Sequence, residues 1–143
     1  MGCGPSENTT PAPKDTITIW GDYFNQDTRA LLAICKMSNI NATFSHVDTF
    51  KQQNFEKEYT DLNPNSTIPM ITEGQVKIIG DGSSLYFYLV NKHNDVFKKF
   101  YSEEQAVDVR MMMGWFQKTM RKTTSKLIRS IVNPRVFNQN SKK

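Results

Sequence analysis

A proline at the start of an apolar run is the feature that most constrains how this chain folds. Thr67-Ile68-Pro69-Met70-Ile71 leads into a short hairpin pattern, and Asp81-Gly82-Ser83-Ser84 then begins a helix pattern. Proline has no N–H to give to a sheet, so it is tolerated at the first residue of a strand, where a tight turn favours the cis isomer. A cis Ile68-Pro69 bond leaves the N–H and C=O of Ile68 facing outward. The helix start offers further N–H groups and a positive dipole end to an anion.

Hydrophobic periodicity before this motif predicts a strand, a helix and a second strand. Residues 17–20 alternate as a strand, and Asn25 or Asp27 can cap the helix that follows. One face of that helix carries Ala30, Leu31, Ile34, Cys35 and Ser38. Residues 42–48 alternate again, and two strands joined through a helix are almost always parallel, with a right-handed connection. Cys35 is then a core residue, and His46 is a strand residue and not a catalyst.

The remaining patterns complete one domain. Residues 50–61 form a polar loop with a short helix, and residues 70–72 and 75–79 form two strands around a Glu73-Gly74 turn. A helix at 83–92 follows. The resulting order, β-α-β-α-β-β-α, is that of the α/β thioredoxin-like fold.

A long helix pattern follows this domain. After a connector at residues 97–101 it runs from about 103 to 132, and Pro134 ends it. Its apolar side carries Val109, Met112, Met113, Phe116, Met120, Leu127 and Ile131, and another side carries Lys118, Lys122, Lys126 and Arg129. The run Met111 to Met113 is packing material or, alternatively, an adaptable docking face. We therefore divide the chain into a flexible arm at 1–16, a domain at 17–94, and a connector, long helix and polar tail at 95–143.

Charge and composition narrow the classes of function. Residues 1–102 have a net charge of −2 and residues 103–143 a net charge of +6. The basic part could meet nucleic acid, an acidic protein or anionic lipid, or could simply be solvated. We expect no nucleic-acid binding, because the basic helix lacks interleaved exposed aromatics and a reading motif. No apolar run approaches the roughly 18 residues of a membrane span, and the N-terminus lacks a signal-peptide layout, so an intracellular protein is expected. Cys3 and Cys35 fit no disulfide or zinc spacing, and no metal site is expected.

The proline motif and the Gly-Ser-Ser helix start resemble the glutathione-holding half of the glutathione transferases. The resemblance covers residues 17 to about 137 and is closest to the theta class, in the proline motif, in Tyr88-Leu89 and in residues 115–121. It implies that the Ile68 backbone pairs with the cysteinyl residue of glutathione, and that the helix start at Gly82 receives its γ-glutamyl carboxylate. At 143 residues the chain is too short for a complete transferase, so we expect only the first long helix of the second domain, a truncated form of the fold.

Catalysis in this family depends on a hydroxyl that hydrogen-bonds the thiol of glutathione. A free thiol with a pKa of about 8.5 is mostly protonated at neutral pH. Theta enzymes use a serine, and a register on Arg29-Ala30 puts Asn25 in its place. An asparagine amide can donate a hydrogen bond, but Asp27 would put negative charge near the thiolate. The same register brings Tyr23 onto the tyrosine of the alpha, mu and pi classes. Tyr23 and Asn25 are therefore the catalytic candidates, with Tyr23 alternatively an ordinary aromatic at a strand end.

The resemblance also implies binding positions. The histidine, the lysine and the Glu-Ser pair of theta enzymes correspond to Asn54, Thr67 and Asp81-Gly82. The charge that grips the glycyl carboxylate is lost, so a weak affinity for glutathione is expected. The full set of glutathione-binding candidates is Asn54, Thr67, Ile68, Pro69, Asp81, Gly82, Ser83 and Arg121. Asn25-Gln26-Asp27-Thr28 stands in place of a Cys-x-x-Cys pair, which rules out dithiol exchange.

Two functions follow from the resemblance. The first is a glutathione transferase-like protein, catalytically weak or inactive, that acts as a binding or structural component of a larger assembly. The second is an active transferase that conjugates glutathione to electrophiles. No cofactor is expected, with glutathione as the possible ligand or substrate. Apolar surface left uncovered on the helix at 103–132 predicts a partner, either a second copy of this chain or a different protein.

The first six residues fit an acylation pattern. Met1-Gly2-Cys3-Gly4-Pro5-Ser6 has glycine second and serine sixth, as in N-myristoylation, and Cys3 is a palmitoylation candidate. Two acyl chains make a stable anchor where one alone binds membranes marginally. The expected location is cytoplasmic, either membrane-associated through Gly2 and Cys3 or within a large intracellular assembly. A plain disordered arm is the alternative.

Overall fold

The computed structural model describes residues 16–98 and 102–127. The chain divides into two compact units, Met1–Val96 and Phe97–Lys143. Each unit is described below by itself. The predictions for the N-terminal arm, including Gly2 and Cys3, and for the end of the long helix lie outside the described residues.

The first unit is built on a four-stranded mixed sheet in the order β2-β1-β3-β4. The strands are β1 (Ile17–Gly21), β2 (Ala42–His46), β3 (Met70–Glu73) and β4 (Val76–Ile79). β1 runs parallel to β2, with Ile17 opposite Ala42, and antiparallel to β3, with Trp20 opposite Met70. β3 and β4 form the predicted hairpin, whose turn holds Gly74 at a positive φ of 55°. The predicted parallel strand–helix–strand unit is confirmed.

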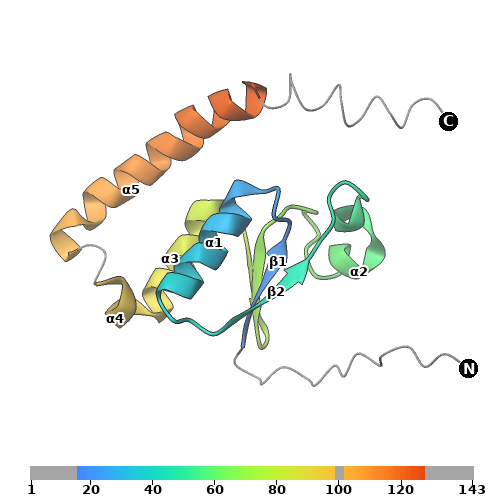
Figure 1. Ribbon diagram of the computed structural model, residues 1–143, viewed down its shortest axis with the longest axis horizontal. Helices are drawn as coiled ribbons and strands as arrows, with labels where there is room; N and C mark the ends of the chain where they lie inside the picture. Colours follow the sequence, from blue (N-terminus) through green and yellow to red (C-terminus); the bar gives the residue numbers. More distant parts are fainter. Residues whose placement is uncertain (1–15, 99–101, 128–143) are drawn as a thin grey trace, which may run out of the picture. The chain divides into compact units, whose positions relative to one another are not determined.

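Helices cover both faces of this sheet. Figure 1 shows α1 (Gln26–Met37) and α3 (Gly82–Lys92) on one side, and α2 (Lys57–Thr60) on the other. The fully buried apolar side chains of the described residues include Ile19, Leu31, Pro69, Met70, Ile71, Leu85 and Leu89. A second cluster lies beneath α2, where Val47, Tyr59 and Met70 pack with Trp20 and Leu62. Because strand residues alternate between the two faces of the sheet, both faces carry apolar side chains, and helices pack on each of them. The thioredoxin-like fold is thereby confirmed.

Cys35 is a core residue, as its helical spacing predicts. Its side chain is free and 3% exposed in the middle of the apolar face of α1. Burial raises the pKa of the Cys35 thiol to about 11, because a thiolate is poorly solvated there. Cys35 is therefore a packing residue and no nucleophile.

The second unit differs in detail from the predicted uninterrupted helix. A short helix, α4 (Asn94–Phe97), whose first three residues belong to the first unit, ends where a connector was predicted to begin. The helical segment then opens with a 3-10 turn, η2 (Glu103–Gln105), capped reciprocally by the Ser102 and Gln105 side chains. It continues as α5 (Ala106–Trp115), passes through a π-helical turn, η3 (Phe116–Met120), and stays helical to residue 127. A π turn adds one residue to a turn without changing the apolar pattern much, which is why periodicity does not reveal it.

No residue of the described segment 102–127 is buried. The large apolar side chains that it exposes are Val107, Met111, Met112, Trp115, Phe116, Met120 and Leu127. No helix in the part of the chain that the structure describes is long and apolar enough to cross a membrane.

Candidate functional site

The Ile68-Pro69 peptide bond is cis, as predicted. Hydrogen bonds from two side chains fix the loop that precedes it. The Tyr59 hydroxyl donates to the carbonyl oxygen of Thr67 at 2.6 Å, and the fully buried Asn63 donates to the same oxygen through Nδ2 at 2.7 Å. Two donors on one carbonyl fix the peptide plane directly before Ile68. The N–H of Ile68 makes no hydrogen bond within the described part of the chain. This N–H is the group that a ligand strand could use.

Asn54 also donates a hydrogen bond to this loop. It is 8% exposed, and its Nδ2 donates to the carbonyl oxygen of Ser66 at 2.9 Å. Ser66 itself has a positive φ of 54°, so the loop turns sharply at this point. The Asn54 side chain, a predicted glutathione-binding group, thus makes a hydrogen bond within the chain's own loop.

Asn25 caps α1 and at the same time contacts the cis-proline loop. Its Oδ1 accepts from the N–H groups of Asp27 at 2.8 Å and Thr28 at 3.1 Å, which are orphan donors at the helix start. Its Nδ2 donates to the carbonyl oxygen of Ile68 at 3.5 Å, a long hydrogen bond. Both ends of the amide are directed at this chain's own backbone, at the position that the resemblance assigns to a catalytic hydroxyl.

Tyr23 makes its ring contacts with residues of β2. Its ring is 59% exposed and contacts Phe44 on β2, with 4.5 Å between ring centroids. β2 and β3 flank β1 on opposite sides, and Ile68 lies two residues before the start of β3. The structure shows a contact with Ile68 for Asn25, and the catalytic role of Tyr23 stays a prediction.

The start of α3 carries its own cap. Asp81 Oδ1 accepts from the N–H of Ser84 at 2.9 Å and from the hydroxyls of Ser83 at 2.8 Å and Ser84 at 2.9 Å. The predicted Ser83 hydroxyl is therefore a donor to Asp81. This arrangement satisfies part of the helix start internally and adds a negative charge beside it.

A second carboxylate reaches the same place from α1. Gly82 is buried, and a Cβ added to it would lie 2.7 Å from Asp27 Cγ and 2.8 and 3.0 Å from the two carboxylate oxygens. Only a glycine leaves room for a side chain so close to the backbone. Asp27 is itself 3% exposed. The sequence indicates that Asp27 stands near the site, but not that its carboxylate rests on Gly82, because the contact joins residues far apart in the chain.

Asp22 is a buried carboxylate that sequence analysis missed. It is 5% exposed, and its two oxygens accept from the N–H of Phe24 at 2.9 Å, the N–H of Thr49 at 3.0 Å and the Thr49 hydroxyl at 2.6 Å. His46 Nε2 lies 3.8 Å from it. Burial alone would raise the pKa of Asp22, but these hydrogen bonds and His46 outweigh burial and hold the pKa below 3.8. Asp22 thus ties the loop after β1 to the loop after β2.

Arg121 lies in the second unit. Its Nη1 donates to Gln117 Oε1 at 2.9 Å, one helical turn earlier. Its predicted role beside glutathione therefore stays a prediction.

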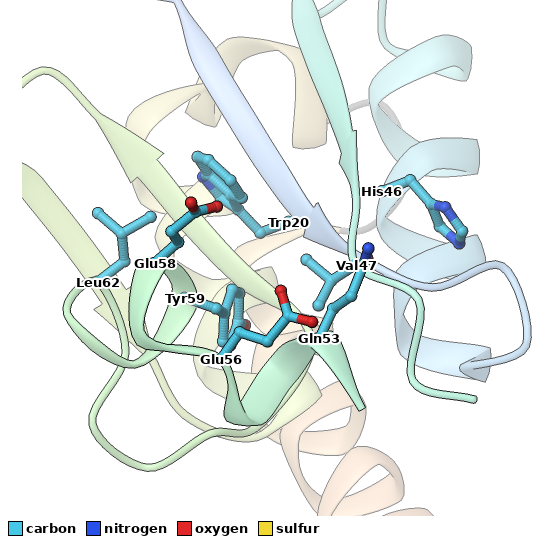
Figure 2. A pocket seen from close by; sticks show the side chains of 8 residues that line it. All are labelled: Trp20, His46, Val47, Gln53, Glu56, Glu58, Tyr59 and Leu62. Atoms are coloured by element: carbon cyan, nitrogen blue, oxygen red, sulfur yellow. The ribbon is translucent and has the colours of Figure 1, made fainter. Parts of the chain in front are cut away.

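The pocket in Figure 2 has a volume of about 400 Å3. Its lining is Trp20, His46, Val47, Gln53, Glu56, Glu58, Tyr59 and Leu62. None of the predicted catalytic or glutathione-binding residues is among them. In Figure 2 the imidazole of His46 points away from the other labelled side chains. The described residues hold no group of three or more His, Cys, Asp or Glu side chains that could bind a metal ion.

Comparison with known proteins finds relatives of one kind. No protein-family model matches the chain. It is 21% identical over 121 residues to Glutathione S-transferase T1 of Arabidopsis thaliana, a match that covers 82% of this chain and 49% of the relative. For Glutathione S-transferase T2 of Arabidopsis thaliana the identity is 22% over 107 residues, covering 73% of this chain and 18% of the relative. The chain thus spans about half the length of the first relative and a smaller part of the second.

Solved structures agree with these sequence matches. Human glutathione S-transferase T1-1 in its apo form superposes with a TM-score of 0.75 at 21% identity, over 82% of this chain and 50% of that one. Human glutathione transferase theta-2, in complex with glutathione, gives a TM-score of 0.71 at 24% identity, over 79% of this chain and 46% of that one. An epsilon-class enzyme from the housefly, Musca domestica, gives 0.72 at 22% identity, over 87% of this chain and 56% of that one. In sequence and in fold the chain is a theta-like relative of the glutathione S-transferases at low identity, with the thioredoxin-like fold of their N-terminal domain.

Proposed function

We propose that this protein binds a thiol-containing peptide of the glutathione kind at Ile68 and has little or no transferase activity of its own. The observation that carries the proposal is the position of the Asn25 side chain. Its oxygen caps α1 and its nitrogen contacts the Ile68 carbonyl oxygen. The N–H of Ile68 is left for one backbone hydrogen bond with a ligand. Two of the similar solved structures contain glutathione, which supports glutathione as the ligand class.

Weak catalysis follows from the electrostatics of the same site. A thiolate is held at neutral pH by hydrogen-bond donors and by nearby positive charge. Here the amide that takes the serine's position is engaged, and the carboxylates of Asp27 and Asp81 lie at the start of α3. Neither carboxylate supplies the positive charge that would lower the pKa of the ligand thiol. The active transferase remains the alternative, and in it Tyr23 or Asn25 would donate to the thiolate.

The second part of the proposal concerns a partner. The described part of the long helical segment exposes a series of methionine and aromatic side chains and buries none of its residues. An exposed apolar surface of this kind marks an interface. We propose that a second copy of the chain or another protein covers it, so that the chain works as a component of an assembly.

Titration calorimetry with reduced glutathione, up to several millimolar, tests the first part. We expect saturable but weak binding, and no conjugation of glutathione to an electrophilic aryl halide above the uncatalysed rate. Oxidised glutathione serves as the control ligand, because its sulfur cannot be a thiolate. Absence of any binding would remove the proposal. Conjugation that is lost in Tyr23→Phe or Asn25→Ala would establish the alternative, an active transferase.

A further inference from the structure

We propose that Asp27 occupies the anion position at the start of α3 and thereby leaves the site without a preference for ligands that carry a carboxylate at that end. The inference rests on the proposed function, since it concerns the same site. Asp27 is, in effect, a carboxylate supplied by the protein where a ligand's carboxylate would otherwise bind.

The contact between Asp27 and Gly82 is the first support. All three atoms of the carboxylate group lie within 2.7 to 3.0 Å of the position that a Gly82 Cβ would take. The group therefore rests directly on the backbone of the first residue of α3. At 3% exposure it leaves no space for a second anion between itself and that backbone.

The electrostatics of α3 explain why an anion is favoured there. α3 has 11 residues, and the first N–H groups of a helix lack partners within the helix. These groups and the helix dipole give this end a partial positive charge that attracts carboxylates. Asp81 already accepts from the Ser84 N–H and from both serine hydroxyls. With Asp27 added, an incoming carboxylate would meet two negative charges and few remaining donors.

Asn25 likewise contacts a backbone group that a ligand would use, the carbonyl oxygen of Ile68. Its Nδ2 contacts the carbonyl oxygen of Ile68 at 3.5 Å. The first turn of α1 and its cap thus direct one side chain at the cis-proline loop and another at α3. Side chains of the protein itself thus contact the Ile68 carbonyl oxygen and the start of α3, whereas the Ile68 N–H stays available to a ligand. A ligand that lacks the γ-glutamyl group should therefore bind with about the same affinity as glutathione.

Two ligands separate this inference from the proposed function. Cysteinylglycine keeps the cysteinyl and glycyl parts of glutathione and lacks the γ-glutamyl carboxylate. Wild-type protein should bind the two ligands with similar affinity, and Asp27→Ala should bind glutathione at least about tenfold more tightly than cysteinylglycine, as expected for a new charge-assisted hydrogen bond. A wild-type preference of tenfold or more for glutathione, or no gain of preference in Asp27→Ala while either ligand binds, would overturn the inference.

Formate supplies a readout that needs no thiol peptide. We expect formate, at constant ionic strength, to raise the unfolding temperature of Asp27→Ala and to leave that of wild-type protein unchanged. Asp95→Asn, which removes an exposed carboxylate from the first turn of α4, is the matched control for net charge and should not respond. If formate stabilises Asp27→Ala but no peptide binds any variant, the anion position is established and the proposed function fails. If formate has no effect on Asp27→Ala, the inference fails whatever the peptides do.

Asp27→Asn keeps the test decisive if Asp27→Ala does not fold. The amide has nearly the same shape as the carboxylate but no negative charge. It should raise the affinity for glutathione relative to cysteinylglycine by a smaller factor than Asp27→Ala, because repulsion is relieved without opening space. An unchanged ratio of the two affinities in a folded Asp27→Asn protein would contradict the inference.

Discussion

Asp22 shows how a single buried charge can organise a loop region. Three donors from two different loops converge on its carboxylate, and His46 stands beside it. A buried carboxylate without such partners would be neutralised by protonation. The hydrogen bonds hold the pKa of Asp22 below its ordinary value of 3.8 despite burial. Nothing in the local pattern around Asp22 indicates this role, because the Thr49 partner follows a different strand.

Replacement of this carboxylate should lower stability. We expect Asp22→Asn to reduce the free energy of unfolding by about 1–3 kcal/mol at pH 7, the range for hydrogen bonds to a charged group. The sign of the pH dependence follows from the lowered pKa. The contribution of Asp22 is fully present above the unfolded-state pKa and is lost as the pH falls below 3.8 towards the native pKa. Urea denaturation at pH 7 and at successively lower pH values measures both effects. A difference between the proteins that does not shrink on acidification would contradict this account.

Cys35 should be chemically silent in the native protein. Its thiol is 3% exposed and its pKa is about 11, so almost no thiolate is present at pH 7. In Cys3→Ser, where Cys35 is the only cysteine left, we expect no rapid reaction with a disulfide reagent until denaturant is added. Rapid labelling of the native variant would show that the α1 face opens, and the buried position would then be wrong.

At the scale of elements, the start of α1 combines two tasks that are usually separate. Asn25 satisfies two N–H groups of the helix and also contacts the cis-proline loop beside β3. The helix itself, its cap and its apolar face are all predictable from periodicity and residue type, because these are local properties. The second contact is not, since it depends on how β1 and β3 lie side by side. The π turn at Phe116–Met120 is likewise invisible to an apolar pattern that the extra residue hardly disturbs.

Asn25→Ser should separate the two tasks. Serine caps a helix about as well as asparagine, so we expect the free energy of unfolding to change by less than about 0.5 kcal/mol. It also places a hydroxyl where the theta-class resemblance has one, without the amide that contacts Ile68. Conjugating activity towards an aryl halide should therefore rise above that of wild-type protein. Asn25→Ala, which removes the cap, is the control and should lose about 1 kcal/mol of stability without gaining activity. Equal activity of all three proteins would show that the Asn25 position does not limit catalysis.

For the whole molecule, the distribution of apolar surface differs between the two units. The first unit buries the apolar faces of its sheet and helices, whereas the described segment 102–127 of the second unit buries no residue. Hydrophobic burial is the main favourable term in folding and association. The exposed side chains of α5 and η3 are the basis of the proposed association. Acylation at Gly2 and Cys3 stays a prediction, which the intact mass of protein from its native source would test.

One negative charge introduced on the exposed apolar surface of α5 should weaken association. Met112 is 58% exposed on α5, and Met112→Glu places a carboxylate among its apolar neighbours. We expect wild-type protein to sediment as a dimer or larger species at micromolar concentration and Met112→Glu to shift towards the monomer. Thr123→Glu, which introduces the same charge at an exposed polar position of the same helix, should leave association unchanged. Wild-type protein that is monomeric throughout this range would exclude self-association and leave a different protein as the partner.

The sequence by itself determined the order of strands and helices in the first unit, the parallel β1–β2 pair, the cis Ile68-Pro69 bond, the burial of Cys35 and the theta-like resemblance. These follow from periodicities of about two and 3.6 residues, from capping residues and from the missing N–H of proline, all of which act within a few residues. Only the tertiary structure decided what the candidate site residues contact. Asn25 meets Ile68, Asp27 meets Gly82, and Tyr23 packs on β2. The physical reason is that hydrogen bonds and charge interactions fall off within a few ångströms, so their partners are set by the packing of distant segments and not by spacing along the chain.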